Sequence, residues 1–283
     1  MTRMRIHKYL GRWGVRLASA FLLVSNALFA NGEERECQSY LLFGVGGANH
    51  LDTYLSPMEY SGVNGVFVKG RERWLKAANA RMTFHSNFQG VFTHTENPAH
   101  SAEEWGGFVA YSAGWLYNWS PAPSFIIGAG GTVGTDLGFL YNPRNSNNPA
   151  QGYLSAELAA AVRATYGINI RKLPVSFRYE AQLPVIGAMF SPQYGQSYYE
   201  MYKGNRDHNV RLTFPGNALS YKGLFSVDFV FKRTTLRAGY LHDIRQSNVN
   251  GIKTHRYVHS FVLGYVRYLT FKDRSQRKKE VQP

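Results

Sequence analysis

The chain has 283 residues, with 32 basic and 18 acidic side chains and a formal net charge of +14. Hydrophobic residues make up 44% of it and aromatic residues 15%, enough to bury a core, which excludes an intrinsically disordered chain. The single cysteine, Cys37, excludes a disulfide framework. No apolar run of about 18 residues follows the N-terminal region, which excludes a polytopic helical membrane protein.

The N-terminal region has the pattern of a targeting segment. Residues 1–16 carry five basic side chains and no acidic one, and an apolar stretch follows from Leu17 to Ala30. A basic region before a short apolar segment is typical of a secretory signal peptide, and the stretch is too short to span a hydrocarbon core of about 30 Å. We therefore predict export by a signal peptide over 1–30, cleaved after Ala30 or, alternatively, after Ala27.

Export changes how the positive charge is interpreted. The signal peptide carries five of the basic residues, and the others cluster only between Lys272 and Lys279. We therefore expect no nucleic-acid partner, and outer-membrane lipid and lipopolysaccharide are the expected negative partners. No metal-ligand spacing such as HExxH or CxxC occurs, and nothing in the sequence implies a metal or a cofactor.

Residues 153–170 alternate between apolar and polar or small side chains with a period of two. The even positions run from Leu154 to Ile170 and are apolar, whereas Glu157 and Arg163 occupy odd positions. A helix would fail to separate these two charges from the leucines, because its side chains repeat every 3.6 residues. The segment is therefore predicted to be an amphipathic strand.

The same alternation recurs in 105–119, 123–139, 175–183 and 221–232. These segments are much longer than the roughly 5 or 6 residues usual for strands of soluble sandwiches. Long strands with an aromatic-rich apolar face in an exported chain indicate an outer-membrane β-barrel. The physical reason is that a sheet in hydrocarbon has to close on itself to satisfy its backbone hydrogen bonds.

Short turns alternate with longer polar connections, which predicts an all-β, up-and-down antiparallel transmembrane barrel of ten strands. Short turns are expected on the periplasmic side and long loops outside. The predicted strands are 38–48, 60–74, 80–95, 104–118, 123–139, 152–170, 173–188, 220–232, 235–246 and 254–271. The predicted long loops are 49–58, 96–103, 140–151, 191–218 and 246–253.

Two points in this assignment stay open. The strand-like sequence HNVRLTF within 191–218 leaves twelve strands as an alternative. The phasing of 60–74 and 254–271 is ambiguous, because both faces carry Val or Phe together with charges. The expected organisation is a periplasmic segment over 31–37, the barrel over 38–271 and a basic periplasmic tail over 272–283.

The strand phasing predicts a charged interior. The side chains expected in the lumen are Arg81, His85, Asp136, Glu157, Arg163, Arg178, Glu180, Asp228, Lys232, Arg237, Asp243 and Arg245. A barrel of this size is only slightly wider inside than its packed side chains. We therefore expect this network to hold the barrel shut, with a narrow polar conduit or ligand cavity as the alternative. The mixed signs argue against a strongly ion-selective pore.

One segment, Phe84 to Phe88, invites a catalytic interpretation. It resembles the His-x-Ser-Asn pattern of outer-membrane phospholipases and lipid A deacylases, in which His and Ser project from one strand face. Here His85 and Ser86 are adjacent, so they point to opposite faces. The spacing breaks the dyad, and we assign no catalytic residue.

Polar and aromatic residues gather at the predicted extracellular loops. The candidate binding residues there are Asp52, Tyr60, Tyr194, Tyr198, Tyr199 and Glu200. Rim hydrogen bonding and lipopolysaccharide contact are the simplest expected roles. The tyrosine-rich loop after residue 190 is expected to fold over the mouth as a structural lid, with a binding surface as the alternative.

Three segments carry a family resemblance: LDTYLSP at 51–57, NSNNPAQ at 145–151 and FSPQYGQSYYE at 190–200. Together they resemble a family of uncharacterised outer-membrane barrel proteins from Bacteroides-type bacteria, over most of the mature chain. The resemblance implies the barrel fold and supplies no activity or catalytic residue.

The sequence thus favours an integral outer-membrane barrel without enzymatic activity, acting as a structural protein, scaffold or narrow pore. One alternative is a lipid-modifying enzyme of the lipid A deacylase or phospholipase type, with a site at the extracellular rim. Another is an accessory subunit of an export or assembly complex, which contacts a protein partner through 191–218 or the basic tail.

Overall fold

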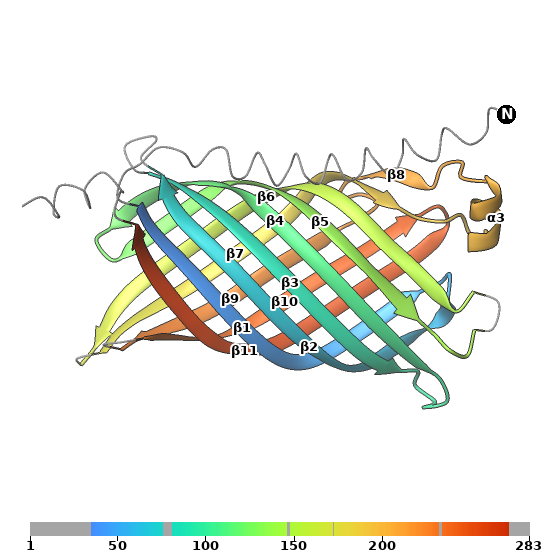
Figure 1. Cartoon of the computed structure of the whole chain (residues 1–283), viewed down its shortest axis with the longest axis horizontal. Helices are drawn as coiled ribbons and strands as arrows, with labels where there is room; N and C mark the ends of the chain where they lie inside the picture. The colour runs from blue at the N-terminus through green and yellow to red at the C-terminus, as the bar shows by residue number, and fades with distance from the viewer. Residues whose placement is uncertain (1–34, 76–80, 146–147, 172, 232–233, 272–283) are drawn as a thin grey trace, which may run out of the picture. The chain divides into compact units, whose positions relative to one another are not determined.

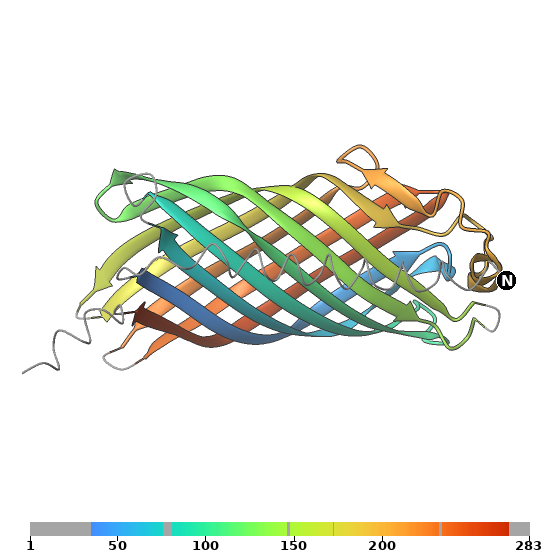
Figure 2. The ribbon, with the colours of Figure 1, turned by 45° about the horizontal axis from the view of Figure 1, so that its top comes forward.

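The computed structural model describes residues 35–75, 81–145, 148–171, 173–231 and 234–271. The predicted signal peptide, residues 31–34 of the predicted periplasmic segment, residues 76–79 between the predicted strands 60–74 and 80–95, Lys232 and the basic tail lie outside the described residues. Long, tilted antiparallel strands close into a barrel (Figures 1 and 2). They are β1 (Arg35–Asp52), β2 (Ser56–Leu75), β3 (Met82–Glu96), β4 (Glu103–Ala122), β5 (Phe125–Tyr141), β6 (Ala150–Ile170), β7 (Leu173–Phe190), β9 (Ser220–Val230), β10 (Thr235–Val249) and β11 (Ile252–Phe271).

The order of the strands closes the sheet. Each strand from β1 to β7 pairs with the next along the chain, β7 continues to β9, β10 and β11, and β11 lies beside β1. The remaining strand, β8 (Val210–Thr213), has four residues and pairs with β7 alone. HNVRLTF therefore does contribute a strand, but not a wall-spanning hairpin. The ten-stranded antiparallel barrel is confirmed, and the twelve-strand alternative is wrong.

The alternation that predicts the strands also decides which face lies outside. On β6, Leu154 and Leu158 are each 52% exposed, whereas Arg163 is 3% exposed. Apolar side chains on the other strands are exposed in the same way, for example Val133 on β5 and Phe225 on β9. The barrel thus presents an apolar exterior and encloses charge, the arrangement suited to hydrocarbon surroundings.

The lumen also contains an apolar cluster, which the ionic interior predicted from the sequence did not include. It is built mainly on neighbouring strands β1, β2, β10 and β11, with Leu42, Val68, Leu241, Val258 and Val262 at its centre. These inward-facing valines explain the ambiguous phasing of 60–74 and 254–271. On those strands, apolar residues occur on both the lipid-facing and the lumen-facing sides.

The connections differ in length between the two ends of the barrel. The longer described connections and helix α3 (Tyr198–Lys203) lie at one end, and β1 begins at the other (Figure 1). Two predicted long loops, 49–58 and 246–253, are shorter in the structure, because strand pairing continues almost to the turns. Between β10 and β11, Asn250 and Gly251 both have positive φ, 55° and 78°, as a two-residue hairpin turn requires.

Helix α3 is capped at both ends. Its N-cap Ser197 and Glu200 form a reciprocal capping box, and Gly204 ends the helix with a φ of 114°. In the described part of the chain, no helix is both long enough and apolar enough to cross a bilayer.

Candidate functional site

The lumen at the end where β1 begins is filled by ion pairs, which we call the lower layer. Its members are Glu72, Arg163, Arg178, Glu180, Asp228 and Arg237. The Glu72 carboxylate lies 2.5 Å from Nη1 of Arg163 and 2.6 Å from Nη2 of Arg178. Arg178 also pairs with Glu180. Three carboxylates face three guanidinium groups, so the layer is balanced in charge.

Arg237 is the most enclosed cation of the lower layer. It donates from Nε and Nη2 to the two oxygens of Asp228 at 2.6 and 2.7 Å and is 0% exposed. Its guanidinium also lies 4.5 Å from the ring centre of Tyr40, a cation–π contact. Gly70 makes room for that ring, because a Cβ there would fall 2.0 Å from a ring carbon of Tyr40.

A second group of charges, the upper layer, lies nearer the loops. Its members are Asp136, Glu157, Asp243, Lys222, Arg245 and Arg256. Arg256 donates to Asp136 at 2.9 and 3.2 Å, and Arg245 donates to Glu157 at 3.2 and 3.4 Å. This layer is balanced as well, with three acidic and three basic groups, but its contacts are longer than those of the lower layer.

The structure brings together nearly all of the lumen residues predicted from sequence. His85 lies inside and lines a cavity of about 10 Å³ with Arg163, Arg178 and Glu180. Arg81 is the exception and corrects the prediction, since it is exposed in the turn before β3 and donates to the Tyr117 hydroxyl. The prediction fails there because Arg81 precedes the strand, and outside a strand the in-and-out alternation of side chains does not apply.

The predicted lumen residues lack three charged members of the two layers, Glu72, Lys222 and Arg256. Glu72 and Arg256 lie on the strands whose phasing was ambiguous, β2 and β11. On β2, Glu72 shares its parity with Asn64 and with the interior valines, whereas Lys69 and Arg71 have the outward parity, so the charges do not identify the inner face.

The mouth of the barrel holds a third polar cluster, in which tyrosine and asparagine side chains surround the carboxyl groups of Asp52 and Glu104. The Tyr153 hydroxyl donates to Asp52, which is 2% exposed and also accepts from the backbone amide of Tyr54. Asn142 donates from Nδ2 to the Tyr60 hydroxyl at 3.0 Å and to Glu104 at 3.1 Å. Asp52 and Tyr60 are therefore buried mouth residues rather than freely exposed loop contacts.

The three segments that carry the family resemblance meet at this mouth. The Tyr54 hydroxyl donates to the carbonyl of Gln196 at 2.9 Å, and the Tyr198 hydroxyl donates to Oε1 of Gln151 at 2.9 Å. Burial raises the pKa of Tyr54 to about 12, with neighbouring Tyr198 and the negative charge of Asp52 contributing. The phenol therefore stays a donor at neutral pH, and the 190–200 segment is bound to the first turn of the barrel.

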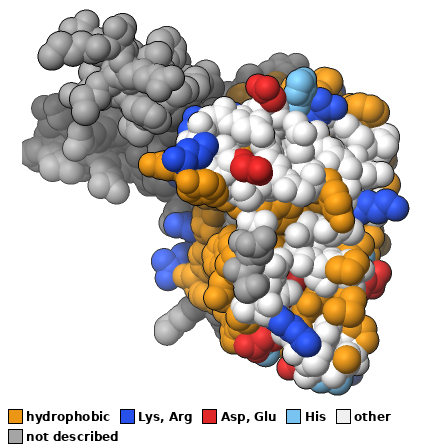
Figure 3. Space-filling view, turned by 90° about the vertical axis from the view of Figure 1, so that its right-hand side faces the viewer, with side chains coloured by type: hydrophobic (Ala, Val, Ile, Leu, Met, Phe, Trp, Pro, Cys, Tyr) orange, Lys and Arg blue, Asp and Glu red, His pale blue; other side chains and the backbone are white. Residues whose placement is uncertain are grey.

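The remaining candidate loop residues divide into capping and exposed groups. Glu200 accepts from the Ser197 amide at 2.8 Å, as the capping box requires. Tyr194 and Tyr199 are 71% and 66% exposed, with Tyr202 beside them at 78%. In Figure 3, charges of both signs are scattered over the loop end and do not gather into a patch of one sign.

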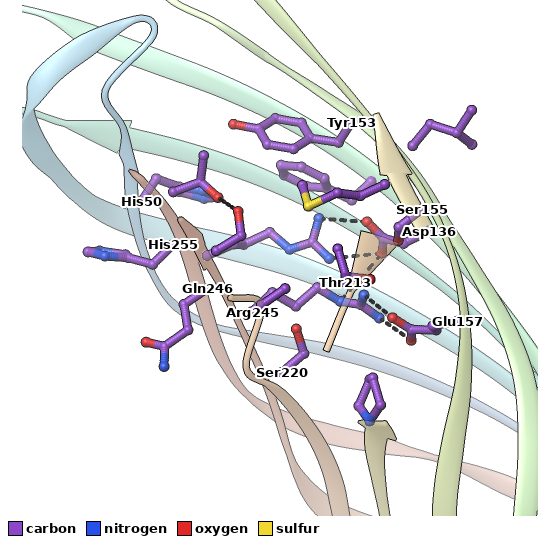
Figure 4. A pocket seen from close by; sticks show the side chains of 18 of the residues that line it. His50, Asp136, Tyr153, Ser155, Glu157, Thr213, Ser220, Arg245, Gln246 and His255 are labelled. Carbon is purple, nitrogen blue, oxygen red and sulfur yellow. Dashed lines mark hydrogen bonds and ion pairs between the residues drawn. The ribbon is translucent and has the colours of Figure 1, made fainter. Parts of the chain in front are cut away.

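A cavity of about 80 Å³ lies beside the upper layer (Figure 4). Arg245 pairs with Glu157 on one side of it, and the His50 imidazole lines it from β1. His50 is 0% exposed, and neither ring nitrogen has a hydrogen-bond partner among the described residues. Its ring stacks on Phe108 with 5.9 Å between ring centres.

These groups form ion pairs and hydrogen bonds inside the barrel. Across the described residues, no cluster of three or more His, Cys, Asp or Glu side chains could hold a metal ion. His85, the histidine of the sequence pattern FHSNF, faces the lower layer and lines its cavity. The arrangement therefore holds charges in place inside the barrel and leaves one small chamber next to its upper layer.

Solved structures with a similar course of the chain are themselves barrels. The transport unit of the autotransporter AIDA-I from Escherichia coli is 8% identical, with a TM-score of 0.42 over 88% of this chain and 97% of that one. The outer membrane protease OmpT from E. coli is 7% identical, with a TM-score of 0.47 over 85% and 98%. The beta domain of the Bordetella autotransporter BrkA is 9% identical, with a TM-score of 0.41 over 83% and 99%. We draw no functional conclusion from likeness at this level.

No curated protein matches the chain. A family model does match it, over residues 17–276, which include every strand of the barrel. The uncharacterised family expected from the three loop segments is thereby confirmed. The chain belongs to the family described as "Protein of unknown function (DUF3316)".

Proposed function

We propose that this protein is an integral outer-membrane β-barrel with a closed lumen, and that it serves as a non-enzymatic scaffold presenting its loop end. The filling of the lumen carries this proposal. Two charge-balanced layers and an apolar cluster occupy the interior, and the cavities lined by the charged residues of these layers measure about 80 and 10 Å³ in the described part of the chain. A conducting pore needs a continuous aqueous path, which such filling opposes.

The membrane location rests on physical grounds. Exposed apolar side chains cover the exterior of a sheet that closes on itself, as hydrocarbon surroundings demand. The basic and apolar pattern of residues 1–30 supports export, and together these features favour the outer membrane.

The scaffold part of the proposal rests on the loop end. The 191–219 connection is bound to the β1–β2 turn through Tyr54 and to the start of β6 through Tyr198. A connection held at several points is a structural lid, and its exposed tyrosines are available to a protein partner. Such a partner, met through this connection or through the basic tail, is part of the proposal.

Conductance in planar lipid bilayers tests the closed lumen. We expect the purified wild type to give no stable current steps. A double variant, Glu72→Ala with Arg178→Ala, removes the centre of the lower layer and is expected to give small ohmic steps. Heat-modifiable migration on gels checks that the variant still forms a barrel. Stable porin-like steps from the wild type would overturn the closed-lumen proposal.

The non-enzymatic part has its own test. Mass spectrometry of lipid A from a deletion strain is expected to give the parental acylation pattern. A changed pattern that the plasmid-borne gene restores would favour the lipid-modifying alternative instead.

A further inference from the structure

The barrel wall is interrupted between β7 and β9 on its loop side, and we call this interruption the seam. The two strands pair only as far as Gln182 and Lys222. Nearer the loops, β7 pairs instead with β8, over Gly187 to Phe190. Within the described part of the chain, no backbone hydrogen bond joins residues 183–186 to residues 214–221.

The local sequence suits such an interruption. Pro184 has no backbone N–H, so it leaves one donor fewer at an unpaired edge. The register between β6 and β7 shifts beside it, which leaves Val185 as a bulge. Across the seam, the chain turns on itself, because the amides of Asn217 and Ala218 donate to the carbonyl of Phe214. On each side of the seam, many backbone N–H and C=O groups therefore form hydrogen bonds without a partner from the other side.

The seam connects an apolar exterior with the cavity. Leu183, Val185 and Ile186 are 40%, 49% and 46% exposed on the outer face of β7. Their neighbours Pro184 on β7 and Ser220 on β9 line the 80 Å³ cavity from the two sides of the seam, and Figure 4 shows Ser220 at the cavity. The seam therefore places the cavity next to the lipid-facing side of β7.

The charges around the cavity compensate one another. Arg256 is paired with Asp136, and Arg245 is paired with Glu157. An additional net charge in this enclosed space would be desolvated without a free counter-ion. The walls therefore favour an uncharged ligand group.

Two buried groups at the cavity lack hydrogen-bond partners among the described residues. His50 is 0% exposed with both ring nitrogens unpaired, and Nε of Arg256 is unpaired as well. A neutral imidazole offers one donor and one acceptor, and the Arg256 Nε–H offers a second donor. A hydroxyl group can both donate to the imidazole and accept from it. An ester oxygen or a second hydroxyl oxygen can accept a hydrogen bond from Nε of Arg256.

We infer that the seam and the cavity form a binding site for an uncharged, hydroxyl-bearing, single-chain amphiphile from the surrounding bilayer. The polar head occupies the cavity against His50 and Arg256, and the chain extends through the seam along β7. A cavity of about 80 Å³ has room for a small polar head.

A monoacylglycerol that carries a diazirine in its acyl chain is the probe. The full barrel is placed in phosphatidylcholine nanodiscs with the probe, irradiated and digested. We expect adducts on peptides from 183–189 and 213–220. Peptides of the opposite wall that contain Val63 or Phe92, which are 63% and 53% exposed, give the background for lipid-facing residues.

Two kinds of variant test the two halves of the site. Ser220→Trp, or Ala218→Trp if the first does not fold, fills the seam and is expected to reduce seam adducts to background. Val63→Trp places the same bulk on the lipid-facing wall of β2 and is the matched control, with no expected effect. His50→Phe keeps the stack on Phe108 but removes both polar atoms, so capture is expected to fall about tenfold. Heat-modifiable migration confirms the fold of each variant.

The outcomes separate the inference from the proposed function. Adducts spread evenly around the barrel, or seam adducts that persist in both tryptophan variants, would overturn the site. Equal capture of a diazirine fatty acid of the same chain length would overturn the uncharged head. The site rests on the proposed membrane location, because its ligand comes from the bilayer. It does not rest on the closed lumen: conductance of the wild type would overturn the closed lumen, while the seam adducts would be unchanged.

Discussion

The lower and upper layers of the lumen contain the same number of charges but are held differently. In the lower layer, Glu72 meets two arginines at 2.5 and 2.6 Å, and the three side chains are 3% to 7% exposed. In the upper layer, the Arg245–Glu157 pair is separated by 3.2 Å, and its side chains are 17% and 16% exposed. Charge balance is therefore common to both layers, and the difference lies in single pairs. Arg245–Glu157 is longer and more exposed than the Glu72 pairs, whereas Asp136 and Asp243 beside it are only 5% and 1% exposed.

The wall around each layer explains the difference. At the lower layer, β7 and β9 are paired continuously, from Val175 to Gln182 on β7. At the upper layer, the same two strands separate, and the cavity lies beside Arg245 and Arg256. A continuous wall excludes water and strengthens each ion pair, because the local dielectric constant falls. Beside the interrupted wall, the Arg245–Glu157 pair is longer and partly exposed.

The largest effect is expected from Glu72→Gln, which removes the charge shared by Arg163 and Arg178. Breaking a buried ion pair leaves an uncompensated charge and costs roughly 3–5 kcal/mol of unfolding free energy. Urea unfolding in detergent micelles, followed by tryptophan fluorescence, measures the loss. Glu59→Gln is the matched control, because it makes the same change at an exposed position of β2 and is expected to leave the midpoint unchanged.

A smaller effect is expected from Glu157→Gln in the upper layer. Its carboxylate is 16% exposed and contacts Arg245 at 3.2 and 3.4 Å, so water can replace part of the lost interaction. We expect a loss of about 1 kcal/mol in the same unfolding measurement. A loss equal to that of Glu72→Gln would contradict the view that the seam makes the upper layer wetter.

The smallest effect is expected from Tyr54→Phe, at the mouth above both layers. This change removes the hydrogen bond to the Gln196 carbonyl, worth about 1 kcal/mol, while leaving the barrel wall intact. Limited proteolysis of the 191–219 connection is expected to become a few-fold faster, with the urea midpoint unchanged. Tyr202→Phe changes an exposed tyrosine of the same connection and should leave the cleavage rate as it is. An unaltered rate in Tyr54→Phe would mean that other contacts hold the connection.

The barrel could be predicted from the sequence because apolar and polar residues alternate with a period of two along its strands. On β6, the leucines and the charges Glu157 and Arg163 keep to opposite parities over the whole strand, and the structure has the same phasing. This pattern is not informative where the interior is itself apolar, as at Val68 and Val258, because the lumen-facing and lipid-facing sides of the strand then both carry apolar residues. It also failed at Arg81, which precedes its strand.

The sequence by itself determined that the strands are amphipathic, that they are too long for a soluble sandwich, and that most of the charges point inward. Those properties follow from residue type and local periodicity. Only the tertiary structure decided that Glu72 joins Arg163 and Arg178, that His50 has no hydrogen-bond partner, and that β7 and β9 separate. Each of these depends on which strands the closure of the sheet brings face to face across the lumen, and no local pattern encodes that distance.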